Sequence, residues 1–320
     1  MHPVPWPLAW HAALYGPDGF YRRAGGPAAH FTTSTHGPLG EVLAEALGVL
    51  ADAEGATRVV DLGAGRGELV AALHRQRPDL AVTGVDVVER PTALPAPVGW
   101  LRSPGGSALP SVLTDLEDVL VVAHEWLDVV PCPVAQVAGG RPLEVRVDPA
   151  TGEETLTGPL DDASADWVAR HWPTDGLPDG ARVEVGLPRD RAWSDLLTRV
   201  RRGTVLAVDY GHTAADRPLR GTLAGYRDGV VVDPVPDGSC DVTAHVAVDS
   251  LVQDQRWSQR EALHLLLGSA TVPEHALATS DPAGYLTALA RTSALRALGD
   301  PSGLGAFHWV LRRVGRAGRG

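Results

Sequence analysis

The stretch Arg58–Glu68, RVVDLGAGRGE, is an apolar run that ends in an acid and then breaks into alternating glycines. An apolar run of this length is typical of a buried parallel strand. Glycines directly after a strand permit a tight turn and let the backbone approach a ligand closely. Apolar residues at helical spacing predict a helix over Glu68–Arg75. The stretch therefore predicts a strand, a turn and a helix around a nucleotide-like cofactor.

A second strand is predicted over Leu80–Val85, directly before Asp86. An acid at the end of the second strand of such a unit can accept hydrogen bonds from ribose hydroxyls. The two strands and the helix between them form a βαβ unit, which favours an α/β fold with a mostly parallel sheet.

The glycine spacing separates two classes of cofactor. The dinucleotide fingerprint G-x-G-x-x-G needs a third glycine at position 68, which is Glu68 here. The pattern is instead acid-x-G-x-G-x-G, which is similar to the first motif of class I S-adenosylmethionine-dependent methyltransferases. Asp61 suits a cofactor with an ammonium group, whereas a pyrophosphate beside this acid would be repelled. A nicotinamide-dependent dehydrogenase is the weaker alternative, and a glycine-rich turn without a ligand is another.

These arguments predict a set of cofactor contacts on the glycine loop and at the end of the second strand. The predicted residues are Asp61, Gly63, Ala64, Gly65, Gly67 and Asp86.

Composition limits the other classes of function. The chain has 320 residues, 44% of them hydrophobic, which suits one large α/β domain or a core with a smaller lobe. A net charge of −11 argues against a general nucleic-acid binder. Two cysteines are too few for a disulfide framework or a zinc site, so no metal is predicted. No apolar run approaches the length of a membrane span, and a cytoplasmic enzyme is expected.

Two further apolar runs are predicted as buried strands that end in acids. Val119–Ala123 leads into Glu125, and Thr204–Val208 leads into Asp209. Ligands of open parallel sheets bind at the carboxyl ends of the strands. The four acids that follow predicted strands should therefore gather along one rim: Asp61, Asp86, Glu125 and Asp209.

The remaining pattern predicts a core, an inserted small lobe and an entry segment. Helices are predicted at Gly37–Leu50, Ala163–Trp172, Asp190–Arg202, Ser258–Gly268 and Pro282–Leu298. A hairpin is predicted at Val134–Val147, strands within Gly221–Leu251 that cover the active site, and a last strand at Phe307–Val314. The predicted division is an entry segment at 1–57, a core at 58–130 and 189–320, and an inserted lobe at 131–188.

Several separate stretches resemble the MidA-like methyltransferases, a group that includes the mitochondrial complex I assembly factor that methylates an arginine. The stretches are HFTTS at His30–Ser34, VVDLGAGRGELVAAL, HEWLDVVP at His124–Pro131, LAVDYGH, and GTLAGYRDG with DVTAHV. The resemblance implies a class I, Rossmann-like methyltransferase fold with S-adenosylmethionine as cofactor, and it adds Thr33 to the cofactor contacts. It further implies a protein substrate, most often arginine, on a subunit of a respiratory complex.

The acceptor site can be argued from the chemistry of methyl transfer. The reaction is an in-line displacement, so the protein mainly positions donor and acceptor and excludes water. A guanidinium nitrogen attacks better when carboxylates orient the group and localise its charge. Glu125 and Asp128 suit that role. Alternatively, the two acids cap a helix that follows the strand at Val119–Ala123.

Asp209 and His245 complete the candidate catalytic residues. Asp209 begins DYG, which is either a strand end that faces the substrate or a turn. Asp241, Thr243 and His245 are predicted to share one face of a strand. A histidine that serves only the structure is the alternative for His245.

Substitutions relative to the family pattern motivate a second hypothesis. His30 stands where the family has Asp, His124 where it has Asn, and Asp228 and Gly229 near an expected His. The first hypothesis is a protein methyltransferase that modifies arginine. The second is a weak or inactive assembly protein that binds S-adenosylmethionine without turnover.

Overall fold

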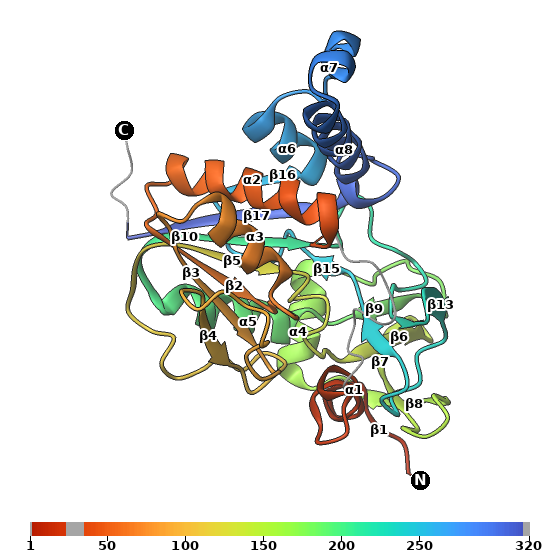
Figure 1. Ribbon diagram of the computed structural model, residues 1–320. Helices are drawn as coiled ribbons and strands as arrows, with labels where there is room; N and C mark the ends of the chain where they lie inside the picture. Colours follow the sequence, from red (N-terminus) through yellow and green to blue (C-terminus); the bar gives the residue numbers. More distant parts are fainter. Residues whose placement is uncertain (1, 24–34, 316–320) are drawn as a thin grey trace.

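A computed structural model describes residues 2–23 and 35–315, so the predicted contact Thr33 and the substitution His30 lie outside the described residues. Its centre is a seven-stranded sheet in the order β16-β17-β10-β5-β2-β3-β4 (Figure 1). The parallel strands are β2 (Arg58–Leu62), β3 (Ala81–Asp86), β4 (Gly99–Arg102), β5 (Leu116–His124) and β10 (Val200–Asp209). The antiparallel strands are β16 (Gln255–Ser258) and β17 (His308–Val314). The predicted α/β fold with a mostly parallel sheet is confirmed.

Helices cover both faces of this sheet because every central strand is apolar on both sides. On one face lie α2 (Gly37–Ala53), α3 (Glu68–Gln76), α6 (Gln259–Leu267) and α8 (Pro282–Leu298), with α7 (His275–Ser280) beside α8 (Figure 1). On the other face lies α5 (Leu187–Thr198). The sequence predicted most of these helices within a few residues, and α8 at both ends.

A second sheet stands beside the first and has the order β1-β7-β6-β9, with β8 paired to β7. Its strands are β1 (Val4–Pro5), β6 (Val134–Ala138), β7 (Arg141–Val147), β8 (Glu154–Pro159) and β9 (Arg182–Glu184). The hairpin β6–β7 turns at Gly139 and Gly140, as predicted. α4 (Asp162–His171) packs on this sheet, and α1 (Trp6–Tyr15) buries Trp6 and Trp10 against it. The division of the chain into core, lobe and entry segment stays a prediction.

Two small sheets follow β10 in the chain. One contains β12 (Ala224–Arg227), β13 (Val230–Val232) and β14 (Asp241–Thr243); the other pairs β11 (Gly211–His212) with β15 (Val246–Ala247). Short 3-10 helices are η1 (Phe20–Arg22) and η3 (Leu304–Ala306).

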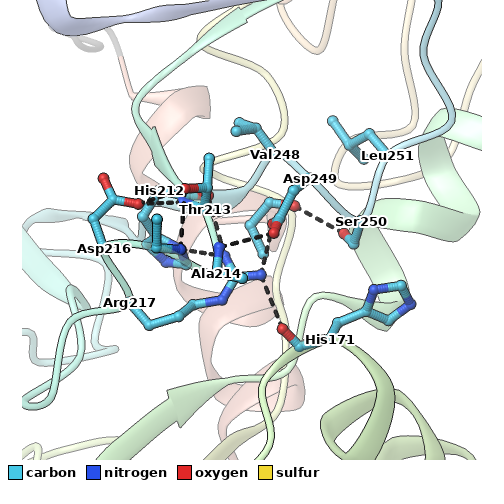
Figure 2. A network of polar contacts seen from close by, with 12 residues as sticks. His171, His212, Thr213, Ala214, Asp216, Arg217, Val248, Asp249, Ser250 and Leu251 are labelled. Carbon is cyan, nitrogen blue, oxygen red and sulfur yellow. Dashed lines mark hydrogen bonds and ion pairs between the residues drawn. The ribbon is translucent and has the colours of Figure 1, made fainter.

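A polar network around the half-buried Arg217 fixes the segment between these sheets (Figure 2). The guanidinium of Arg217 donates to Oδ1 of Asp249 at 2.6 Å and to the carbonyl of His171 at 2.9 Å. The same group lies 2.7 Å from Nδ1 of His212. Burial and the charge of Arg217 lower the pKa of His212 to about 3, so the ring is neutral and Nδ1 can accept a hydrogen bond. The network ties β11 and β15 to the end of α4.

Two expectations about helices are wrong. The helix predicted at Asp190–Arg202 spans Leu187–Thr198 instead, because Pro188 suits the first helical turn and Val200 already pairs with Leu116. No helix begins directly after β5 among the described residues; residues 125–130 form turns that lead to β6. The alternative in which Glu125 and Asp128 cap such a helix is therefore excluded.

Candidate active site

A cavity of about 940 Å³ opens at the carboxyl ends of β2, β3 and β5. This volume lies in the range of small-molecule sites. The cavity is lined by the glycine loop, the turn after β5, residues of α1, η1, β12 and β14, and the segments that follow β3 and β4. Of the predicted residues, the lining includes Asp61, Gly63, Ala64, Gly65, Gly67, Asp86, Glu125 and Asp128.

The three glycines of the loop all have left-handed backbone conformations, which disfavour residues with a Cβ. Their φ angles are +73° at Gly63, +57° at Gly65 and +83° at Gly67. A Cβ at Gly65 would meet no atom within 4 Å, whereas a Cβ at Gly67 would lie 2.6 Å from Leu94. Gly65 therefore leaves room in the cavity, and Gly67 lets α3 start against Leu94.

The glycine loop is tied to the end of β3. The backbone N–H groups of Gly63 and Ala64 donate to the carbonyl of Val85, at 2.9 and 3.2 Å. The N–H of Gly65 donates to Oδ2 of Asp86 at 2.8 Å. Burial raises the pKa of Asp86 to about 6, although hydrogen bonds from the N–H groups of Gly65 and Val88 oppose the rise. Asp86 thus holds the loop and keeps lone pairs for a ligand hydroxyl.

Asp61 is a buried carboxyl on the cavity wall, with 3% of its surface exposed. Burial, followed by the charges of Asp86 and Glu68, raises its pKa to about 8. An uncompensated carboxylate is costly in such surroundings, and a nearby cation would lower the cost. The position therefore favours a cationic group of a ligand.

Glu125 stands where β5 ends. Its φ of +50° is uncommon for a residue with a side chain, and such strain is concentrated at functional sites. Its N–H donates to the carbonyl of Val208 at 2.9 Å, which holds this backbone in place. Its carboxylate lies 3.4 Å from Nδ1 of His124, whose pKa is lowered to about 4 by burial. The strained backbone holds Glu125 at the wall of the cavity.

Asp128 and Asp209 are coupled across the same turn. Oδ2 of Asp209 accepts hydrogen bonds from the N–H groups of Leu127 and Asp128, at 2.9 and 3.3 Å. Asp128 lines the cavity, and its Oδ1 is buried with no hydrogen-bond partner among the described residues. Burial raises the pKa of Asp128 to about 6. Burial and the charges of Asp128 and Glu125 raise the pKa of Asp209 well above its ordinary value. Asp209 therefore sits behind the rim and supports it.

The buried side chain of Arg189 holds the same turn from the other side. Its guanidinium donates to the carbonyls of Asp128 at 2.8 Å, Val130 at 3.2 Å and His245 at 2.8 Å. Its charge lowers the pKa of Asp128 and so opposes the effect of burial. Sequence reasoning missed Arg189, because nothing around it in α5 indicates these distant carbonyls.

The N-terminal segment supplies a wall of the cavity that the sequence did not predict. The hydroxyl of Tyr21 donates to Oδ1 of Asp241 at 2.7 Å, and that of Tyr15 donates to the carbonyl of Val129 at 3.2 Å. Burial raises the pKa of Asp241 to about 7. Tyr226 lines the same end of the cavity. In the sequence, the alternation of Asp241 with Thr243 was the one pattern that pointed to this wall of the cavity.

His245 lies away from the cavity. The strand β14 ends at Thr243, so the expectation that His245 continues its face is wrong. The chain leaves the strand because the N–H of His245 donates to Oγ1 of Thr222 at 2.8 Å. Its ring stacks on Tyr210 with centroids 5.7 Å apart. Tyr210 lines the cavity, and His245 supports it from behind.

Three other features are relevant to function: the free thiols, the possible metal ligands and the length of the apolar helices. Cys132 and Cys240 are buried free thiols. Among residues 2–23 and 35–315, no three histidine, cysteine or acidic side chains are placed to hold a metal ion. Within the same ranges, no helix has the length and apolar character needed to cross a membrane.

Comparison with protein families gives a match over residues 73–264 to the model of an S-adenosyl-L-methionine-dependent methyltransferase. That match covers more than half of the chain. No curated protein matches the sequence.

Two crystal structures of proteins from Burkholderia thailandensis share the fold. The first is a superfamily member that is described as a likely methyl transferase, and it is bound to S-adenosyl-homocysteine. It superposes with a TM-score of 0.73 at 24% identity, and the match covers 99% of this chain and 89% of the other. The second, an uncharacterized protein of that superfamily, superposes with a TM-score of 0.71 at 23% identity, covering 99% and 88%. Both structural similarities extend over nearly the whole chain, and what they show is a shared fold.

Proposed function

Because the chain belongs to the MidA-like family of S-adenosylmethionine-dependent methyltransferases, we propose that it methylates a protein side chain, with arginine as the acceptor. By resemblance, a subunit of a respiratory complex is the first substrate to test, and a cytoplasmic location is part of the same proposal. Membership of this family argues against the alternative of a nicotinamide-dependent dehydrogenase.

The glycine loop fits the cofactor. The open space at Gly65 admits a ligand against the backbone, and the raised pKa of Asp61 favours an ammonium beside it. Asp86 can accept hydrogen bonds from ribose hydroxyls with its remaining lone pairs. Thr33 stays a further proposed contact. When bound, S-adenosylmethionine would supply a methyl group activated by its sulfonium, and breaking of that carbon–sulfur bond would leave S-adenosyl-homocysteine.

One observation carries the choice of acceptor: Oδ1 of Asp128 is buried at the cavity without a partner among the described residues, close in sequence to Glu125. Carboxylates in a buried corner favour a cation, and a guanidinium can pair with two oxygens at once. The rings of Trp126 and Tyr226 line the same cavity and can contact a cation over their faces.

The chain's own residues would then perform three tasks. Glu125 and Asp128 orient the guanidinium so that one nitrogen faces the methyl group, as an in-line displacement requires. Glu125 accepts the proton that this nitrogen releases once its bond to the methyl carbon has formed, and the product remains a cation. Asp209 keeps the turn rigid through the N–H groups of Leu127 and Asp128.

Labelled methyl transfer tests this proposal. The protein is incubated with methyl-labelled S-adenosylmethionine and basic peptides that contain either one arginine or a lysine in its place. The expected result is label on the arginine peptide alone, located on the guanidinium by mass spectrometry. Tight cofactor binding without transfer to any peptide or protein would support the assembly protein instead. Absence of cofactor binding would overturn both.

A further inference from the structure

The cavity wall formed by β14 and β12 continues outward onto β13. In the register of this sheet, Asp241 lies opposite Tyr226, and Tyr226 lies opposite Val231. Residues directly opposite each other share a face of the sheet. Asp241 and Tyr226 line the cavity, whereas Val231 is 67% exposed at the periphery of the molecule, where Figure 1 shows β13. One row of side chains therefore leads from the candidate acceptor site to an open edge.

The outer edge of β13 presents backbone groups for pairing. Asp228 and Gly229, with φ angles of +51° and +79°, form a two-residue hairpin turn between Arg227 and Val230. The pair that closes such a turn is hydrogen-bonded, and pairs alternate along an antiparallel ladder. The N–H and C=O of Val231 must then point away from β12. No strand of the described residues pairs with this edge.

Acidic side chains surround the edge. Asp228, Asp233 and Asp237 are all exposed around β13, and they outnumber the one exposed base of the hairpin, Arg227. The cavity behind it contains further carboxylates, and the chain as a whole carries a net charge of −11. A second copy of this chain would bring an equally acidic edge against the first, which is unfavourable. A basic extended segment complements both the charge and the open ladder.

We propose that β13 receives an extended, basic segment of the acceptor protein as an added strand, a mode of recognition that uses backbone hydrogen bonds for affinity. This inference rests on the proposed function. Strands are spaced by about 4.8 Å, so the added strand would lie about 14 Å, three spacings, from β14. An arginine on the docked strand cannot span that distance. The acceptor arginine therefore belongs to the stretch that follows or precedes the strand and turns toward the cavity.

Removal of the outward backbone N–H of Val231 tests whether the edge of β13 binds a strand. Val231→Pro removes the outward N–H, and proline is tolerated on an edge strand where that group faces solvent. Val231→Thr keeps the N–H and serves as the matched control. The probe is a labelled peptide of eight alternating valine and arginine residues, measured by fluorescence anisotropy with S-adenosyl-homocysteine and excess free arginine present. A second peptide, methylated on alternate backbone nitrogens, keeps the charge and removes the strand donors.

We expect Val231→Pro to weaken binding of the probe at least tenfold, while Val231→Thr stays within twofold of the parent protein. The backbone-methylated peptide should bind at least tenfold more weakly to the parent protein. Asp233→Asn should weaken binding and reduce its dependence on salt. Circular dichroism confirms that each variant is folded.

Three results would overturn the inference: no binding of the probe to the parent protein, equal binding to both Val231 variants, or a dimer in sedimentation that Val231→Pro dissolves. Because the measurement is of binding and needs no turnover, its outcome is separate from that of the proposed activity. A protein that methylates arginine peptides while Val231→Pro changes nothing would retain the function and lose the docking edge.

Discussion

The backbone N–H of Gly65 donates a 2.8 Å hydrogen bond to Oδ2 of Asp86, and the N–H of Val88 donates to Oδ1 at 3.1 Å. One carboxylate thus joins the glycine loop after β2 to the loop after β3. Hydrogen bonds to a charged acceptor are stronger than neutral ones, so the loop is held in shape before any ligand arrives. A substitution at Asp86 therefore affects the shape of the site as well as a direct contact.

Asp86→Ala should weaken the binding of S-adenosylmethionine by roughly 1.5–3 kcal/mol, the usual value of hydrogen bonds to a charged group. Asp86→Asn keeps one acceptor oxygen for the Gly65 amide and should lose less. Isothermal titration calorimetry on both variants measures the difference. Equal affinity in the parent protein and Asp86→Ala would remove this residue from the cofactor site.

Gly65→Val tests whether the open space at the loop belongs to the cofactor. A Cβ at this position meets no protein atom within 4 Å and the position lines the cavity, so the branched side chain should take up cofactor space and lower cofactor affinity at least tenfold. Gly55→Val is a matched control, because Gly55 has a φ of +59° against +57° at Gly65 and a Cβ there would likewise meet no atom within 4 Å. Both variants carry the same backbone strain, about 1–2 kcal/mol. Calorimetry should show a loss of affinity in Gly65→Val alone.

The stability of the ligand-free protein should decrease from pH 7 to pH 8 because of Asp61. Its pKa is about 8 in the folded protein against 3.8 ordinarily, so folding favours the protonated acid. This contribution is complete below the ordinary pKa and is lost as the pH rises through 8. Asp128 and Asp241 have pKa values of about 6 and 7, so their contributions to stability are lost mostly at lower pH. His124 adds only a small slope of the opposite sign, since its pKa is lowered to about 4 and its ordinary value of 6.5 lies below this window.

Urea unfolding at pH 7.0, 7.5 and 8.0 measures this effect in the parent protein and in Asp61→Asn. The slope that one proton can contribute is about 1.4 kcal/mol per pH unit. Asp61→Asn should be less dependent on pH over this window. S-adenosylmethionine should also stabilise the parent protein more at pH 8 than at pH 6. Identical slopes in the two proteins would show that Asp61 does not titrate there.

The parts of the fold that the sequence predicted are those set by local pattern. The β2–α3–β3 unit follows from one apolar run, spaced glycines and a helical stripe, all within 30 or so residues. The helix α8 spans Pro282–Leu298 as predicted; proline suits its first turn, and Gly299 follows its last residue. The helix at Asp190–Arg202 failed at both ends, because its last turn competes with sheet pairing at Val200.

The parts of the site that the sequence did not predict depend on contacts between distant segments. Tyr21 and Asp241 are 220 residues apart, and Arg189 reaches a carbonyl 61 residues away. Neither contact leaves a periodic signal near the residues concerned. His245 was misplaced for a related reason: alternation predicted a strand, while a hydrogen bond to Thr222 turns the chain after Thr243.

Glu125→Gln separates chemistry from cofactor binding. Glutamine keeps the size of the side chain and removes its charge, so the acceptor cation loses a preorganised partner. We expect methyl transfer in single turnover to fall by at least tenfold and cofactor affinity to stay within about twofold, because Glu125 lies outside the glycine loop. Single-turnover transfer to an arginine peptide and calorimetry with S-adenosylmethionine measure the two quantities.

Glu117→Gln is the matched control for this last experiment, because Glu117 lies at the opposite end of the same strand, β5, where it pairs with Arg202 at the surface. It removes one negative charge from the protein without altering the cavity, so a general electrostatic effect would appear in both variants. If Glu125 only stabilised the backbone beside His124, Glu125→Gln would lower the melting temperature and leave transfer per folded molecule intact. Loss of transfer in Glu125→Gln alone, at an unchanged melting temperature, is the result that assigns Glu125 to the acceptor.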